Sequence, residues 1–217
     1  MDQSSKQREF ELLKAKIEQL EEELQDAKAE ENWRPTGFYG TYYATTGALL
    51  GIFGAGVALL VNVIGAPAAG KHPLELIRVY LTFPLGDAAL QLTEPARQVP
   101  LIEDGMVLTF GCCLYLATGM LLGIPYYLAL TRLCKGSSLA GRLMVSSVLS
   151  IALWLTLYYG VLSWLQPMLF GGNWITDPKV LPVWVGLVTH LIFGWTFAAL
   201  APLVRFQPYQ QPSTSQN

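Results

Sequence analysis

Apolar and charged positions divide this chain into a charged N-terminal segment and four long apolar runs. Asp, Glu, Lys and Arg are absent from residues 35–70, 105–131, 143–176 and 180–204. Each run exceeds the roughly 20 apolar residues with which a helix crosses a hydrocarbon core about 30 Å thick. The pattern predicts an all-α integral membrane protein, with a four-helix transmembrane bundle inside a membrane domain at residues 42–204. Its spans are expected near residues 42–64, 106–130, 143–165 and 181–204.

The loop between the first two spans, residues 66–104, is too long for a simple turn. Prolines interrupt it, and its apolar stretch, Leu74 to Leu92, contains Glu75, Arg78 and Asp87. Charged residues within so short an apolar stretch argue against a further membrane crossing. We expect short helices in this outer loop, either interfacial helices lying on the outer surface or a re-entrant hairpin.

The N-terminal segment has the spacing of a coiled coil. Apolar residues recur at intervals of three and four, as at the a and d positions of a heptad repeat. They are Phe10, Leu13, Ile17, Leu20, Leu24 and Ala27. The repeat predicts a cytoplasmic coiled-coil helix over residues 1–32, followed by an interfacial linker at residues 33–41.

Charges beside this apolar stripe favour a parallel homodimer. With Phe10 at position a, each g residue would face the e residue five positions later on the partner helix. The three resulting pairs are attractive: Glu9 with Lys14, Lys16 with Glu21, and Glu23 with Lys28. We therefore expect a homo-oligomer formed through this helix. A single amphipathic helix resting on a partner membrane subunit or on lipid headgroups is the alternative.

Basic residues indicate which loops face the cytoplasm, because Lys and Arg near a span are retained on that side. The loop between spans two and three contains Arg132, Lys135 and Arg142 and no acidic residue. Arg34 precedes the first span and Arg205 follows the last. We expect a multi-pass protein of the bacterial inner membrane with both termini cytoplasmic, ending in a disordered tail at residues 205–217.

Small residues form a stripe along the first span, which allows close approach of helix backbones in lipid. They are Gly40, Ala44, Gly47, Gly51, Gly54, Ala58 and Gly65. In span four, Gly186 and Gly194 flank His190 at intervals of four residues. We interpret both sets as interhelical packing positions. A helix that moves or lines a path is the alternative for so many glycines.

His190 is the one readily ionisable side chain expected at mid-membrane depth, which makes it a functional candidate. A neutral imidazole on the small face of span four would hydrogen-bond another helix. Its expected partner is a span-three hydroxyl group, from Ser146, Ser150 or Thr156, with Thr189 as a local alternative.

Two further interpretations of His190 are a proton relay and a cofactor ligand. A relay would normally have a carboxylate or second titratable partner at depth, and the spans contain none. As a haem ligand, His190 could join His72 only if the outer loop folds inward. His190 and His72 are thus the cofactor candidates of the sequence, but we expect no cofactor and no metal site.

Composition and motifs argue against catalysis and nucleic acid binding. Charged residues make up only 14% of the chain, the net charge is −2, and no basic stripe with interleaved aromatic residues occurs. Nucleophile-elbow, HExxH and phosphate-binding motifs are absent. Glu103, Asp104 and His72 of the outer loop could form a site, but solvation and helix initiation are their ordinary roles.

These features favour a non-catalytic function. We expect an accessory, assembly or scaffold subunit that docks on a membrane complex, while its coiled coil joins copies or partners in the cytoplasm. A small oligomeric transporter or channel is the alternative, and a haem-binding electron-transfer subunit is the third hypothesis.

Overall fold

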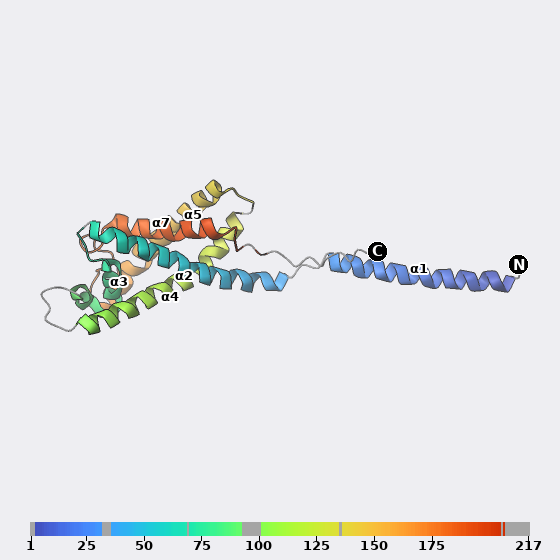
Figure 1. Cartoon of the computed structure of the whole chain (residues 1–217), viewed down its shortest axis with the longest axis horizontal. Coiled ribbons are helices and arrows are strands. Elements are labelled where there is room, and N and C mark those ends of the chain that lie inside the picture. Colours follow the sequence, from blue (N-terminus) through green and yellow to red (C-terminus); the bar gives the residue numbers. More distant parts are fainter. Residues whose placement is uncertain are drawn as a thin grey trace. The chain divides into compact units, whose positions relative to one another are not determined.

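The computed structural model describes residues 3–31, 36–68, 70–92, 101–134, 136–204 and 206, and the regular structure within these ranges is entirely helical (Figure 1). Its helices are α1 (Gln3–Glu31), α2 (Thr36–Ala68), α3 (Glu75–Leu85), the 3₁₀-helix η1 (Gly86–Gln91), α4 (Leu101–Leu133), α5 (Leu139–Leu155), the π-helix η2 (Thr156–Leu162), α6 (Ser163–Phe170) and α7 (Val183–Leu200). The chain forms two compact units. One contains α1, and the other is the membrane domain, Gly40–Phe206.

Four helical segments of the described chain are long and apolar enough to cross a membrane, which confirms the predicted number of spans. They are Gly40–Ala68, Asp104–Leu133, Leu139–Phe170 and Val183–Leu200. The third is continuous through α5, η2 and α6. This architecture is compatible with a multi-pass membrane protein.

The predicted linker and tail lie partly outside the described residues. α2 already begins at Thr36, inside the linker expected at residues 33–41, and residues 32–35 are outside the description. The predicted disordered tail lies outside it as well, except for Phe206. The ring of Phe206 packs edge-on against Tyr42 of α2, with 5.1 Å between the ring centroids.

The predicted outer loop contains two short helices, α3 and η1, which pack against each other. α3 also contacts α4 and α6, and its Ile77 and Leu81 are almost fully buried beside Leu108 of α4. Arg78 is accommodated within this packed helix by an ion pair of 2.9 Å with Glu75, one turn earlier. The interfacial or re-entrant placement of this segment in a membrane stays a prediction.

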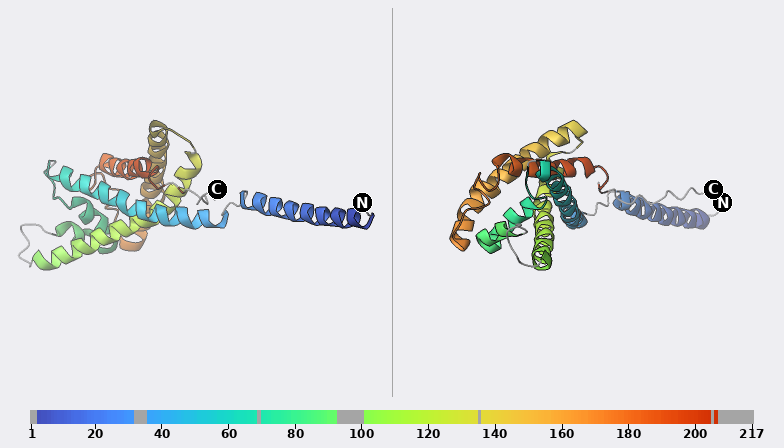
Figure 2. Two further views of the ribbon diagram at one scale, coloured as in Figure 1. Left: turned by 45° about the vertical axis from the view of Figure 1, so that its right-hand side comes forward. Right: turned by 60° about the vertical axis from the view of Figure 1, so that its left-hand side comes forward.

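Glycines bring the backbones of α2 and α4 together, and the two helices run side by side in Figure 2. A Cβ atom added at Gly51 would lie 2.9 Å from the carbonyl carbon of Gly119, and one added at Gly47 would lie 2.8 Å from the carbonyl oxygen of Gly123. Such distances leave no room for a side chain. Close backbone packing without side chains between helices is a common device in membrane proteins.

Other members of the predicted stripe differ in their surroundings. Gly54 faces Phe193 of α7, which would lie 3.0 Å from an added Cβ atom, and Ala58 is completely buried. Cβ atoms at Gly40 and Gly65 would meet nothing within 4 Å among the described residues. The central part of α2 is therefore the closely packed part within the described chain, and packing at the two end glycines stays a prediction.

α5 and α7 pack along one another, with α4 joined to α5 by buried hydroxyl groups. The Tyr126 hydroxyl group lies 2.8 Å from Oγ of Ser146 and 2.9 Å from Oγ of Ser150, and it donates to the carbonyl oxygen of Ser146. Trp195 donates from Nε1 to Oγ of Ser147 over 2.8 Å. Polar side chains of α4, α5 and α7 thus bond to one another across helices, which lowers the cost of placing them in apolar surroundings.

Candidate functional site

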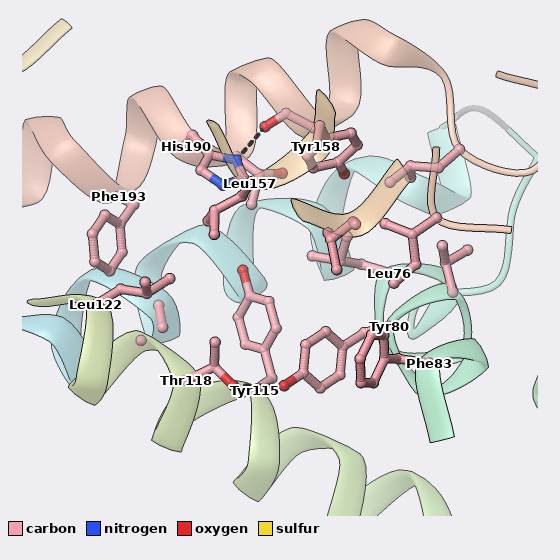
Figure 3. Close-up of a pocket in the computed structure, with 18 of the residues that line it drawn as sticks. Leu76, Tyr80, Phe83, Tyr115, Thr118, Leu122, Leu157, Tyr158, His190 and Phe193 are labelled. Carbon is pink, nitrogen blue, oxygen red and sulfur yellow. Dashed lines mark hydrogen bonds between the residues drawn. The ribbon is translucent and has the colours of Figure 1, made fainter. Parts of the chain in front are cut away.

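A partly enclosed cavity of about 350 Å³ lies inside the membrane domain. Its walls come from α2, α3, α4, the third span, the following loop and α7. The lining is mainly aliphatic and aromatic: Ala55, Leu76, Val79, Tyr80, Phe83, Pro84, Leu114, Tyr115, Thr118, Gly119, Leu122, Leu153, Leu157, Tyr158, Leu162, Ile175, Leu181, Gly186, Thr189, His190 and Phe193. Figure 3 shows the labelled side chains converging on this space from separate helices. We regard the cavity as the candidate site because apolar pockets with a few polar groups are typical binding sites.

His190 faces the cavity from α7 (Figure 3). Its Nδ1 atom lies 2.8 Å from the carbonyl oxygen of Gly186, one helical turn earlier. A carbonyl oxygen only accepts hydrogen bonds, so this contact places the imidazole proton on Nδ1. In the neutral ring Nε2 is then an acceptor, and it makes no hydrogen bond with the described part of the chain. The cavity therefore contains one unpartnered imidazole acceptor.

Tyr80 and Tyr115 form the opposite side of the cavity, with their rings edge to face and 5.5 Å between centroids. The Tyr80 hydroxyl group is engaged with Oγ1 of Thr118 over 2.6 Å. The Tyr115 hydroxyl group makes no hydrogen bond among the described residues. In Figure 3 it is directed into the cavity, towards the side on which His190 lies.

Tyr158 packs against His190, with 6.0 Å between ring centroids in an edge-to-face arrangement. Its position depends on the absence of a side chain at Gly186, where a Cβ atom would lie 2.7 Å from the Tyr158 hydroxyl oxygen. Nε1 of Trp154 would lie 3.1 Å from the same atom. The absence of a side chain at Gly186 therefore allows Tyr158 and Trp154 of the third span to pack directly against α7.

The π-helix η2 supplies Leu157, Tyr158 and Leu162 to the wall of the cavity. The N–H of Ser163 donates to the carbonyl oxygen of Tyr158, five residues earlier, instead of the four of an α-helix. Short π-helical turns within α-helices often occur at functional sites. Here the wider turn lies where the third span borders the cavity.

The hydrogen bond predicted between His190 and a span-three hydroxyl group is not formed. Ser146 and Ser150 bond to Tyr126, and the imidazole bonds to the carbonyl group of its own helix. Tyr126 on α4 engages both serines, because its hydroxyl group lies within hydrogen-bond distance of each. Thr189, the local alternative, instead accepts a bond of 3.0 Å from Nδ2 of Asn62.

The second predicted cofactor candidate is separate from the cavity. His72 does not line it, and Nδ1 of His72 accepts a hydrogen bond of 3.1 Å from the N–H of Leu74. Within the described ranges, no group of three His, Cys, Asp or Glu side chains is suited to hold a metal ion. Asp104 of the outer loop is buried, and the side chain of Glu103 lies outside the described residues.

The apolar residues predicted to form a coiled coil lie along α1 and are exposed. The exposed fractions are 65% for Phe10, 57% for Leu13, 58% for Ile17, 50% for Leu20 and 57% for Leu24. The side chains of Ala27 and Lys28 lie outside the described residues. An uncovered row of large apolar side chains is therefore a second candidate site, of the protein-interaction kind.

Sequence reasoning missed Tyr80, Tyr115 and Tyr158, which contribute three of the side-chain hydroxyl groups at the cavity. Their signal was available, since all three lie in apolar segments, where a phenolic hydroxyl group is an uncommon polar group. The described chain is thus a helical protein with an internal apolar cavity and four helices long and apolar enough to cross a membrane. No family model matches it, and comparisons with curated proteins and with solved structures gave no match.

Proposed function

We propose that the protein is a non-catalytic accessory, assembly or scaffold subunit of a membrane complex. The four spans would hold it in the bilayer, and α1 would join copies of the chain in the cytoplasm. The observation that carries the proposal is the exposed apolar stripe of α1, defined by Phe10, Leu13, Ile17, Leu20 and Leu24. Each of these side chains is at least half exposed.

Exposed contiguous apolar surface favours association, because burying it releases about 25 cal/mol per Å². The charges beside the stripe support a second copy of α1 as the occupant. Glu9 and Lys14 attract each other across a parallel pair, as do Lys16 and Glu21. About three heptads is short for an isolated coiled coil, but anchoring both chains in one membrane raises their effective concentration.

The lipid-facing side chains of the spans support embedding of the bundle in a membrane or against another subunit. Large apolar residues are exposed on each long span, including Phe53 on α2, Phe110 on α4, Met144 on α5 and Trp184 on α7. In water this surface would be unfavourable. In a bilayer it contacts lipid tails or the apolar surface of a partner protein.

The proposal includes both termini in the cytoplasm of a bacterial inner membrane. Arg132 in the last turn of α4 and Arg142 in the first turn of α5 flank the α4–α5 loop, and these basic residues support this orientation. Cys134 lies in the same loop and provides the test, in a chain whose other cysteines are replaced (Cys112→Ser and Cys113→Ser). A membrane-impermeant maleimide should label Cys134 only after the membrane is permeabilised. Labelling of intact cells would contradict the orientation.

The scaffold proposal is tested by the mass of the full chain, purified in mild detergent, and by the proteins that accompany it. Leu20→Glu places a charge on the apolar stripe and should reduce the oligomer to a monomer. Leu12→Glu is the matched control, because Leu12 is 72% exposed and lies off the stripe. A wild-type monomer without stoichiometric partners would overturn the proposal.

A second candidate function, a small oligomeric transporter or channel, is favoured by the cavity itself. Alternating access requires a central space bordered by packed helices, and the cavity meets that requirement. His190→Ala should then abolish flux in proteoliposomes while the oligomer persists. Equal flux from wild-type and variant protein would remove His190 from a transport path.

A further inference from the structure

Two polar side chains that face the cavity from opposite sides, His190 and Tyr115, indicate the ligand that it fits. We propose that the cavity binds an uncharged amphiphile whose apolar body carries a hydroxyl group, held between His190 and Tyr115. Prenols, phenols and quinols belong to this chemical class. The inference does not depend on α1 and goes beyond a scaffold function.

The walls of the cavity exclude a charged ligand. None of the described residues that line it is Asp, Glu, Lys or Arg. Moving an ion from water into such surroundings without a counter-charge is very unfavourable. Leu76, Leu122, Leu157 and Phe193 instead offer apolar contact from four different elements (Figure 3). The body of the ligand is therefore apolar.

His190 requires a hydrogen-bond donor on the ligand. Because Nδ1 is committed to the carbonyl group of Gly186, only Nε2 is available, and in the neutral ring it accepts. A hydrocarbon, an ether or a ketone has no O–H or N–H to offer this atom. A hydroxyl group satisfies it directly.

Tyr115 complements the same hydroxyl group from the opposite wall. Its phenolic O–H has no partner in the described chain and is directed into the cavity. A ligand hydroxyl group can donate its proton to His190 and accept one from Tyr115 at the same time. Tyr80 cannot replace Tyr115 so readily, because Tyr80 is already bonded to Thr118 at 2.6 Å.

The size of the cavity sets the size of the bound part. A volume of about 350 Å³ lies at the lower end of the range usual for small-molecule sites, roughly 300–1,000 Å³. Two fused aromatic rings with one hydroxyl group fit within it. The rings of Tyr80, Phe83 and Phe193 provide edges and faces against which such a body can pack.

The test uses full-length protein in lipid nanodiscs and two probes of nearly equal shape, 2-naphthol and 2-methylnaphthalene. Binding is measured by equilibrium dialysis against empty nanodiscs, which corrects for partition into lipid. We expect saturable binding of one 2-naphthol per chain, about tenfold tighter than binding of 2-methylnaphthalene, since one buried hydrogen-bonding group contributes that much. Equal affinity for both probes would overturn the proposal, because it would mean apolar filling alone.

Two variants test whether Tyr115 and His190 cause the preference for 2-naphthol. Tyr115→Phe keeps the ring and should remove most of the preference for 2-naphthol without weakening 2-methylnaphthalene. His190→Leu should also remove most of the preference for 2-naphthol. If His190→Leu does not fold, the result for Tyr115→Phe alone tests the proposal. Tyr159→Phe is the control, because Tyr159 is 53% exposed and does not line the cavity. Unchanged preference in Tyr115→Phe, or absence of saturable wild-type binding, would refute the inference.

Discussion

Nε2 of Gln166 donates a hydrogen bond of 3.2 Å to Oγ1 of Thr82, and both residues are completely buried. The other end of the same amide accepts a bond of 3.1 Å from the N–H of Ile175. One glutamine on α6 thus joins the third span to α3 and to the loop that leads into α7. The three segments that it joins all border the cavity.

We predict that Gln166→Leu destabilises the membrane domain by about 1–3 kcal/mol, because it leaves the buried N–H of Ile175 without an acceptor. The change should lower the melting temperature of the purified protein, measured by loss of the monodisperse peak after heating. Met168→Leu is the control, since Met168 is 68% exposed on the same helix. Equal melting temperatures for Gln166→Leu and wild type would show that the amide contributes little.

Glycines at the α2–α4 contact should tolerate no side chain. Gly51→Ala places a Cβ atom 3.1 Å from Cα of Gly123 and even closer to Gly119, so the helices must separate, at a cost of about 1–3 kcal/mol. Gly65→Ala meets open space and should leave stability unchanged or raise it slightly. Thermal unfolding of the two variants under identical conditions compares them. A smaller loss at Gly51 than at Gly65 would contradict the packing described.

Charge reversal should distinguish a parallel pair of α1 helices from a helix that binds another surface. Lys16→Glu replaces an attraction to Glu21 of the second copy with a repulsion, and should weaken dimerisation several-fold. Adding Glu21→Lys to this variant should restore it. Glu22→Lys changes the charge on the opposite face and serves as the control. Failure of the second change to restore the dimer mass would exclude parallel pairing.

Cys134 should react slowly with thiol reagents at neutral pH. Burial raises the pKa of its thiol above the usual range, and the nearby Arg142 guanidinium partly offsets the increase. Since the thiolate reacts, iodoacetamide alkylation should accelerate as the pH rises towards this raised pKa. Arg142→Gln should raise the pKa further and slow the reaction at neutral pH, whereas Arg132→Gln should not. The rates are measured with Cys112 and Cys113 replaced by serine.

The spans were predictable from sequence because lipid imposes a simple rule on composition. Runs without charged residues end near the helix ends, as at Lys71 after α2 and Arg132 in the last turn of α4. α3 departs from this rule, because Glu75 and Arg78 interrupt its apolar pattern. Their mutual ion pair explains how a packed helix contains both.

The cavity was not predictable, because it depends on which helix faces meet. His190 was identified as a candidate from its rarity in the spans, but its partner was not. The imidazole bonds to the Gly186 carbonyl oxygen of its own helix, whereas Ser146 bonds to Tyr126. Periodicity gives the face of each helix, whereas the rotation of one helix against another depends on side-chain shapes such as those at Gly51 and Gly119.

The π-helical turn in the third span keeps the buried side chains before and after it on the same side of the helix. Buried residues recur there every four positions, at Ser146, Ser150, Trp154, Tyr158 and Gln166, with Leu162 half-buried between the last two. In an uninterrupted α-helix of 3.6 residues per turn, this spacing drifts around the axis by about 40° at each step. The extra residue in η2 counters the drift. A deletion of one residue within Thr156–Leu162 would therefore remove the π-helical turn and leave Gln166 in phase with Ser146. Straightening the span into a regular α-helix without a deletion would instead rotate Gln166 by about 100°, turning its amide away from Thr82.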